Sequence, residues 1–128
     1  MGNWFIESEP YSVDFQSGLL AGDPTVTEVV SALGHDVRAH RSVPAAIYAF
    51  LRHPESFEEA VQFAVRLGGD TDTIGAMAGA IAGACYGVEG IPETWIECLE
   101  NSEKGRDYIS ALATKLHERH VEERSRRT

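Results

Sequence analysis

The chain has 128 residues, of which 43% are hydrophobic, and this length and composition suit one globular domain with its own core. Its formal net charge of −9 argues against a general nucleic-acid-binding surface, which would need a basic face. An acidic chain can still bind an anionic ligand when metal ions lie between the two.

Residues 1–6 contain neither a basic segment nor a long apolar stretch, so we expect no signal peptide. The two cysteines, Cys85 and Cys98, form no CxxC or Cys/His zinc pattern. Cys85 lies in an apolar run and is expected to be a small buried residue. These features favour a reducing compartment, and hence an intracellular protein: cytoplasmic first, with the nucleus or mitochondrion as alternatives.

The first half of the chain predicts short helices separated by glycine and proline. Residues 1–24 have an irregular pattern that could hold one helix over 11–20. A helix is expected over 25–33, ended by Gly34, with one apolar face formed by Val26, Val29, Val30 and Leu33. Residues 35–41 are expected to form a polar connection.

Ser42 is the expected N-cap of the next helix, because Pro44 is tolerated in a first helical turn. That helix should cover residues 45–52 and bury Ala46, Ile47, Phe50 and Leu51. Ser56 and Glu59 have the spacing of a capping box and predict a further helix up to residue 67. Its apolar stripe is expected to comprise Phe57, Ala60, Val61, Ala64, Val65 and Leu67.

Residues 74–86 contain no charged side chain, which predicts a helix buried on every side and too short to span a bilayer. Gly75, Gly79 and Gly83 recur every four residues and give this helix one smooth face. Each interior glycine costs ~1 kcal/mol relative to alanine, so we expect another helix to pack closely against that face.

The C-terminal part predicts a short helix over 92–99 and a longer amphipathic helix over about 105–121. The inward residues of the longer helix are expected to be Tyr108, Ile109, Leu112, Leu116 and Val121. Residues 122–128 form a charged tail that should fray. No strand-like alternation, repeat or linker occurs, so the sequence predicts one all-α domain over residues 1–128.

Asp70, Asp72 and Thr73 place two carboxylates and a hydroxyl at the start of the uncharged helix. Such hard oxygen ligands suit Mg²⁺, Ca²⁺ or Mn²⁺, and Gly68 and Gly69 let the backbone turn sharply before them. The alternative is structural, with Asp72 as an N-cap stabilised by the helix macrodipole. The spacing alone leaves the helix cap and the metal ligand equally open.

Residues 67–74, Leu-Gly-Gly-Asp-Thr-Asp-Thr-Ile, followed by Met-Ala-Gly-Ala-Ile-Ala-Gly-Ala over 77–84, resemble the C-terminal signature of the ADP-ribosylglycohydrolase family. Within that family the similarity is greatest to the ADP-ribosylhydrolase 3-like type. Residues 33–39, 42–52 and 91–95 are similar to further family stretches, so the resemblance extends over roughly residues 10–117.

The resemblance implies an all-α orthogonal helical bundle that holds two Mg²⁺ ions. It implies that Asp70, Asp72 and Thr73 are metal ligands and that Val37 contacts bound ADP-ribose. The implied reaction is hydrolysis of the glycosidic bond of ADP-ribose, on protein serine or in poly(ADP-ribose). The implied partners are therefore ADP-ribose or an ADP-ribosylated protein.

The family's Gly-Asp-Ala-type motif, its Thr-Asp-Asp metal motif and its phosphate-binding glycine loop do not occur in this sequence. The resemblance therefore implies the C-terminal portion of the fold, with one of the two sets of metal ligands and no identified catalytic acid. Two hypotheses follow: a Mg²⁺-dependent hydrolase that is incomplete as an isolated chain, or a non-catalytic module that binds ADP-ribose or a partner protein. A partial fold exposes apolar surface, so we expect self-association, without membrane insertion or direct nucleic-acid binding.

Other candidate ligands are weaker. His117 and His120 lie three residues apart on a strongly charged helix and are expected to be solvated. The remaining histidines, His35, His40 and His53, are isolated and are expected to be exposed.

Overall fold

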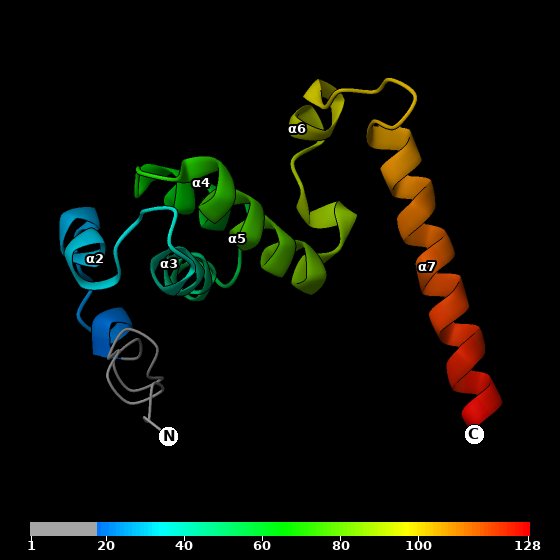
Figure 1. Cartoon of the computed structure of the whole chain (residues 1–128), viewed down its shortest axis with the longest axis horizontal. Helices are drawn as coiled ribbons and strands as arrows, with labels where there is room; N and C mark the ends of the chain where they lie inside the picture. Colours follow the sequence, from blue (N-terminus) through cyan, green and yellow to red (C-terminus); the bar gives the residue numbers. More distant parts are fainter. Residues whose placement is uncertain (1–17) are drawn as a thin grey trace. The chain divides into compact units, whose positions relative to one another are not determined.

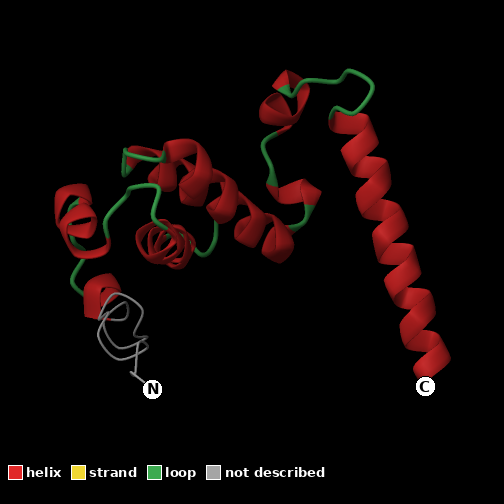
Figure 2. Ribbon diagram, viewed as in Figure 1, coloured by secondary structure: helices red, strands yellow, loops and turns green. Residues whose placement is uncertain are grey.

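A computed structural model describes residues 18–128 as helices joined by loops, without a strand in that range (Figures 1 and 2). The all-α prediction is therefore confirmed. The helices are α2 (Val26–Leu33), α3 (Ala39–Arg52), α4 (Phe57–Arg66), α5 (Thr71–Tyr86), α6 (Glu93–Cys98) and α7 (Arg106–Arg127), with a 3₁₀ turn η2 (Val88–Gly90) after α5. Of the helix predicted over 11–20, only residues 18–20 fall within the described range, and they are helical.

The chain divides into two compact units, Met1–Ile91 and Pro92–Thr128. The first contains α2 to α5 and η2, and the second contains α6 and α7. The expectation of one domain over residues 1–128 stays a prediction.

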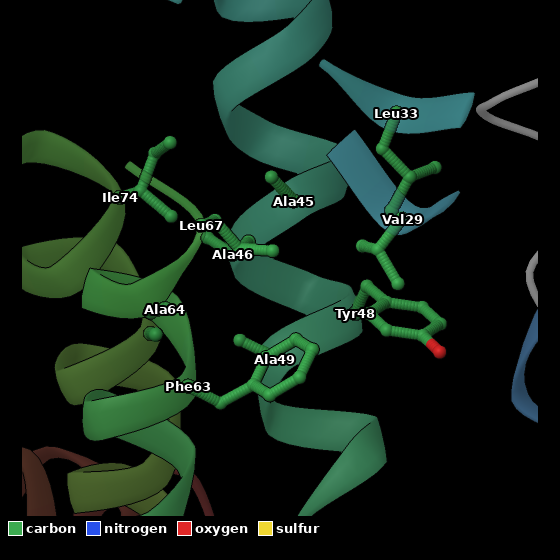
Figure 3. Packing of buried hydrophobic residues seen from close by; sticks show 11 residues of the cluster. Val29, Leu33, Ala45, Ala46, Tyr48, Ala49, Phe63, Ala64, Leu67 and Ile74 are labelled. Atoms are coloured by element: carbon green, nitrogen blue, oxygen red, sulfur yellow. The ribbon is translucent and has the colours of Figure 1, made fainter. Parts of the chain in front are cut away.

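The core of the first unit is built around α3, which packs against α2, α4 and α5. Figure 3 shows its alanines between residues of α2 and residues of α4 and α5. Small side chains let these helices approach closely, while a few larger ones fill the remaining space. The buried cluster comprises Val29, Leu33, Ala45, Ala46, Tyr48, Ala49, Phe63, Ala64, Leu67, Ile74 and Ala78.

Helix α2 begins and ends as the sequence predicts. Thr25 is its N-cap: the Thr25 hydroxyl accepts from the Glu28 N–H, and the Glu28 carboxylate accepts from the Thr25 N–H at 2.8 Å. These bonds satisfy backbone donors that the first turn would otherwise leave unpaired. The Thr25 N–H, and after it the Thr25 hydroxyl, donates to the Glu28 carboxylate and lowers the pKa of Glu28. Gly34 ends the helix with its N–H on the Val30 carbonyl.

Helix α3 begins earlier than predicted, and Ser42 is not its N-cap. The helix starts at Ala39, so Ser42 lies inside it, buried, with its hydroxyl donating to the Arg38 carbonyl at 3.3 Å. Pro44 is accommodated within the helix. The Arg38 N–H donates to the Asp36 carboxylate at 3.0 Å, which fixes the chain just before the helix.

The buried face of α3 also differs from the predicted one. Ala46 is buried as expected, but Ile47 and Phe50 are half-buried and Leu51 is exposed. The other buried residues of the helix are Ser42, Pro44, Ala45, Tyr48 and Ala49. The segment carries apolar residues on several sides, so its periodicity did not distinguish the side on which the neighbouring helices pack.

Helix α4 has the predicted N-cap, with the Ser56 hydroxyl accepting from the Glu59 N–H at 3.2 Å. Ala60, Ala64 and Leu67 are buried as expected. Val65 is exposed, and Phe63 is buried in the core instead. The tilted ring of Phe63 lies 6.0 Å from that of Tyr48, centroid to centroid.

The glycine face of α5 packs against α4, as predicted. A Cβ on Gly75 would lie 3.4 Å from Val65, and one on Gly79 would lie 3.6 Å from Val61. The other expectation, burial on every side, is wrong for the described residues. Ile74, Ala78 and Ala82 are buried, whereas the positions that face away from α3 and α4 are exposed, among them Ala76, Ala80, Ala84 and Cys85.

In the second unit, α7 begins at Arg106, close to the predicted start at about 105, and continues past Val121 to Arg127. The fraying expected for 122–128 stays a prediction. The Asp107 N–H donates to the Asn101 side chain at 2.9 Å and fixes the helix start. The residues predicted to face inward, Tyr108, Ile109, Leu112, Leu116 and Val121, are all exposed. Within residues 18–128, no helix combines the length and apolarity needed to cross a membrane.

Candidate functional site

Two consecutive glycines with left-handed backbone connect α4 to α5. Gly68 has φ +74° and Gly69 has φ +65°, a region that residues with a side chain rarely adopt. A Cβ on Gly69 would lie 2.1 Å from the His35 carbonyl oxygen, so no side chain fits there. This Gly68–Gly69 turn reverses the chain and delivers Asp70 to the start of α5.

Asp70 occupies the N-cap position of α5, yet its side chain makes no capping hydrogen bond. Asp72 lies inside the first turn of the helix, where its carboxylate accepts from the Thr73 N–H at 3.0 Å. The alternative of Asp72 as the N-cap is therefore wrong. The Asp70 carboxylate, in the capping position, is not used to cap the helix.

Asp70 and Asp72 are two residues apart at the start of α5. The contact with the Asp70 carboxyl is the first cause of the lowered pKa of Asp72, and the Thr73 N–H is the second. None of the ion pairs among residues 18–128 includes Asp70 or Asp72. Within that range, the two carboxyl groups at this helix N-terminus therefore have no cationic side chain paired with them.

The donor set suits a hard divalent cation. Carboxylate and hydroxyl oxygens are the ligands that Mg²⁺ and Ca²⁺ take in proteins. The residues that could hold it are Asp70, Asp72 and Thr73, the last two being exposed. In the described range no three His, Cys, Asp or Glu side chains cluster in a way that could hold a metal.

His35, which was expected to be exposed, is half-buried against the Gly68–Gly69 turn. Its Nδ1 lies 2.5 Å from the Leu67 carbonyl oxygen, and its own carbonyl accepts from the Asp70 N–H at 2.8 Å. Spacing gave no signal for this residue, because its partners lie more than 30 residues away. The paired glycines were the only hint that another backbone segment approaches closely.

Val37 lies on the loop between α2 and α3 that also carries His35. Its side chain is 79% exposed and so is available to a ligand. Asp36 stabilises this loop through the guanidinium of Arg38, with Arg41 nearby at 3.7 Å. These contacts, the Arg38 hydrogen bond foremost, lower the pKa of Asp36 to about 2.

The other histidines differ in exposure. His40, His117 and His120 are exposed, as expected. His53 is half-buried instead, with Nδ1 3.6 Å from the Glu59 carboxylate and its ring 5.3 Å from that of Phe63. It lies at the far end of α3 from the Gly68–Gly69 turn and has a packing role.

The structure is thus a helical protein with two carboxylates at the start of α5, and comparison with known proteins identifies its family. The chain belongs to the ADP-ribosylglycohydrolase family, whose model matches residues 6–126. It is 44% identical over 125 residues to the ADP-ribosylhydrolase ARH3 of Mus musculus, covering 88% of this chain and 33% of that protein. The Homo sapiens ADP-ribosylhydrolase ARH3 is 43% identical, with the same coverage.

A bacterial relative is more distant. The ADP-ribosylarginine hydrolase Tri1 of Serratia proteamaculans is 37% identical over 75 residues, which are 59% of this chain and 19% of that protein. The chain thus spans about a third of the length of the ARH3 relatives that it matches.

Proposed function

We propose that this chain takes part in Mg²⁺-dependent hydrolysis of the glycosidic bond that joins ADP-ribose to protein serine or to a further unit of poly(ADP-ribose). The observation that carries the proposal is the Asp70–Asp72 pair at the start of α5, which takes part in no ion pair among residues 18–128. Membership of the ADP-ribosylglycohydrolase family and the similarity to ADP-ribosylhydrolase ARH3 support the substrate class.

In this proposal Asp70, Asp72 and Thr73 hold Mg²⁺, and Val37 contacts ADP-ribose. Bound Mg²⁺ would orient and polarise the ribose hydroxyls and a water molecule next to the anomeric carbon. The exposed Val37 side chain would bury its apolar surface against the ligand. We assign the catalytic acid to none of residues 18–128, and we propose that hydrolysis needs further ligands and an acid beyond this set.

The metal part is tested by isothermal titration calorimetry of the full chain with Mg²⁺. We expect weak binding by the wild type and binding at least about tenfold weaker in Asp70→Asn and Asp72→Asn, because each removes a charged ligand. Glu93→Gln is the matched control, since it neutralises an exposed carboxylate in the first turn of α6. Equal Mg²⁺ affinity in all four proteins would contradict the assigned ligands.

The substrate part is tested with ADP-ribose and with three conjugates: a serine-ADP-ribosylated peptide, poly(ADP-ribose) and an arginine-ADP-ribosylated peptide. We expect ADP-ribose to bind more tightly with Mg²⁺ than without it, and release of ADP-ribose from the serine conjugate or the polymer only with Mg²⁺. Preferential release from arginine would assign the linkage named for the bacterial relative, ADP-ribosylarginine hydrolase Tri1. Binding without turnover of any conjugate would indicate a non-catalytic ADP-ribose-binding module, and no binding would end the proposal.

A further inference from the structure

His35 connects two loops that the proposed function needs together. The loop between α2 and α3 carries Val37, and the Gly68–Gly69 turn leads into Asp70. The two segments contact each other through His35 at both its side chain and its backbone.

The side-chain contact ends α4. Leu67 is the C-cap of that helix and is buried, so its carbonyl oxygen needs a partner within the protein. The His35 Nδ1 lies 2.5 Å from it. A carbonyl only accepts, so Nδ1 must carry the hydrogen and donate it.

The backbone contact begins α5. The Asp70 N–H donates to the His35 carbonyl at 2.8 Å, and the absence of a side chain on Gly69 is what allows that carbonyl to come so close. A Cβ on Gly68 would lie 3.5 Å from Nδ1, so the imidazole ring also lies against the turn. His35 thus holds the turn at Leu67, before the glycines, and at Asp70, after them.

We propose that His35 is a positioning residue that holds the Gly68–Gly69 turn and so sets the placement of the Asp70 and Asp72 carboxylates for a divalent cation. The metal part of this inference rests on the proposed function. The hold on the turn rests on the contacts of His35 alone. Residues that orient metal ligands from behind typically change metal affinity 10- to 100-fold when they are lost.

The test compares three full-length variants with the wild type. His35→Leu removes the donor and keeps an apolar side chain of similar reach. His35→Asn keeps a donor close to the position of Nδ1, so it should rescue. His40→Leu changes an exposed histidine of α3 and serves as the control.

The first readout is hydrogen exchange of the Asp70 amide, measured by NMR without metal. We expect exchange to be at least about tenfold faster in His35→Leu, and close to wild type in His35→Asn and His40→Leu, because a loosened turn exposes the amide more often. The second readout is Mg²⁺ affinity by calorimetry, which should fall roughly 10- to 100-fold in His35→Leu only.

Unchanged Asp70 exchange in His35→Leu overturns the inference, whether or not Mg²⁺ binds. Faster exchange with unchanged Mg²⁺ affinity overturns the metal role of His35. A wild type that binds no Mg²⁺ overturns the proposed function, and the exchange data then still decide whether His35 holds the turn. If His35→Leu does not fold, His35→Ala and His35→Asn give the same comparison.

Discussion

Gly69 is the residue on which the close approach of the two loops depends. Its φ of +65° and the 2.1 Å that would separate a Cβ from the His35 carbonyl oxygen exclude alanine on two grounds. At Gly68 only the backbone conformation is unfavourable, because a Cβ there would contact the His35 ring at 3.5 Å.

We therefore expect Gly68→Ala to lower the free energy of unfolding by about 1 kcal/mol, the cost of left-handed backbone for an L-residue. Gly69→Ala should lower it by more than ~2 kcal/mol, because a backbone atom must also move. Urea denaturation of the two variants measures both values. Equal losses would show that the contact with His35 is not what requires glycine at position 69.

A pH dependence follows from Asp36, whose pKa lies at about 2, below its ordinary value of 3.8. A pKa that is lower in the folded state stabilises the fold above the ordinary value, and this stabilisation is lost as the pH falls through the folded value. The free energy of unfolding should thus decrease from about pH 4 to about pH 2, and less steeply in Asp36→Asn than in the wild type. Urea denaturation across this range measures both slopes, with Glu93→Gln as the control, and parallel slopes would contradict the prediction.

Single residues were predicted well where the evidence was local. The Asp70, Asp72 and Thr73 cluster and the Ser56 cap are short-range patterns, and the structure places both at helix starts. His35 was missed because a contact across more than 30 residues leaves no spacing to detect. Ser42 was misassigned because a serine two residues before a proline is typical of an N-cap, but it also fits inside a helix that has already begun, as it does in α3.

At the scale of elements, the glycines of helix α5 are a strong sequence signal, but the packing around two of them does not require glycine. Its glycine face contacts α4, but a Cβ on Gly79 or Gly83 would lie 3.6 Å or more from any neighbouring atom. That is ordinary van der Waals contact, so alanine fits at both positions within the described packing. The sequence correctly predicted which face of α5 packs against another helix. It could not predict the distance between α4 and α5.

Gly79→Ala should therefore raise the free energy of unfolding by about 0.5 to 1 kcal/mol, because alanine restricts the unfolded chain and favours the helix. Gly79→Leu should lower it by about 1 to 3 kcal/mol, because the longer side chain meets Val61. Thermal and urea denaturation of both variants check the opposite signs. A loss of stability in the alanine variant would mean that the helices must lie closer than the structure has them.

At the scale of the whole molecule, several large apolar side chains among residues 18–128 are exposed. On α7 alone they include Leu112 and Leu116, which are 55% and 70% exposed. Periodicity predicted these residues as an inward face, and it carries no information on whether that face meets its own chain or another.

We expect the isolated chain to self-associate as its concentration rises, because association removes apolar surface from water. Sedimentation velocity over a range of concentrations measures this. The double variant Leu112→Gln with Leu116→Gln should associate less, and Ala113→Gln with His117→Gln, one position further along the helix, is the control. A wild type that sediments as a monomer at every concentration would contradict the expectation.

His35 connects the α2–α3 loop to the Gly68–Gly69 turn through one backbone hydrogen bond and one side-chain hydrogen bond. The Asp70 N–H reaches a main-chain carbonyl, which every amino acid at position 35 provides, whereas the bond to Leu67 needs a donor that few side chains place correctly. Substitution at this position therefore weakens the connection without abolishing it. Position 35 is thus a place where the hold on the Gly68–Gly69 turn can be changed while the Asp70 and Asp72 side chains stay the same.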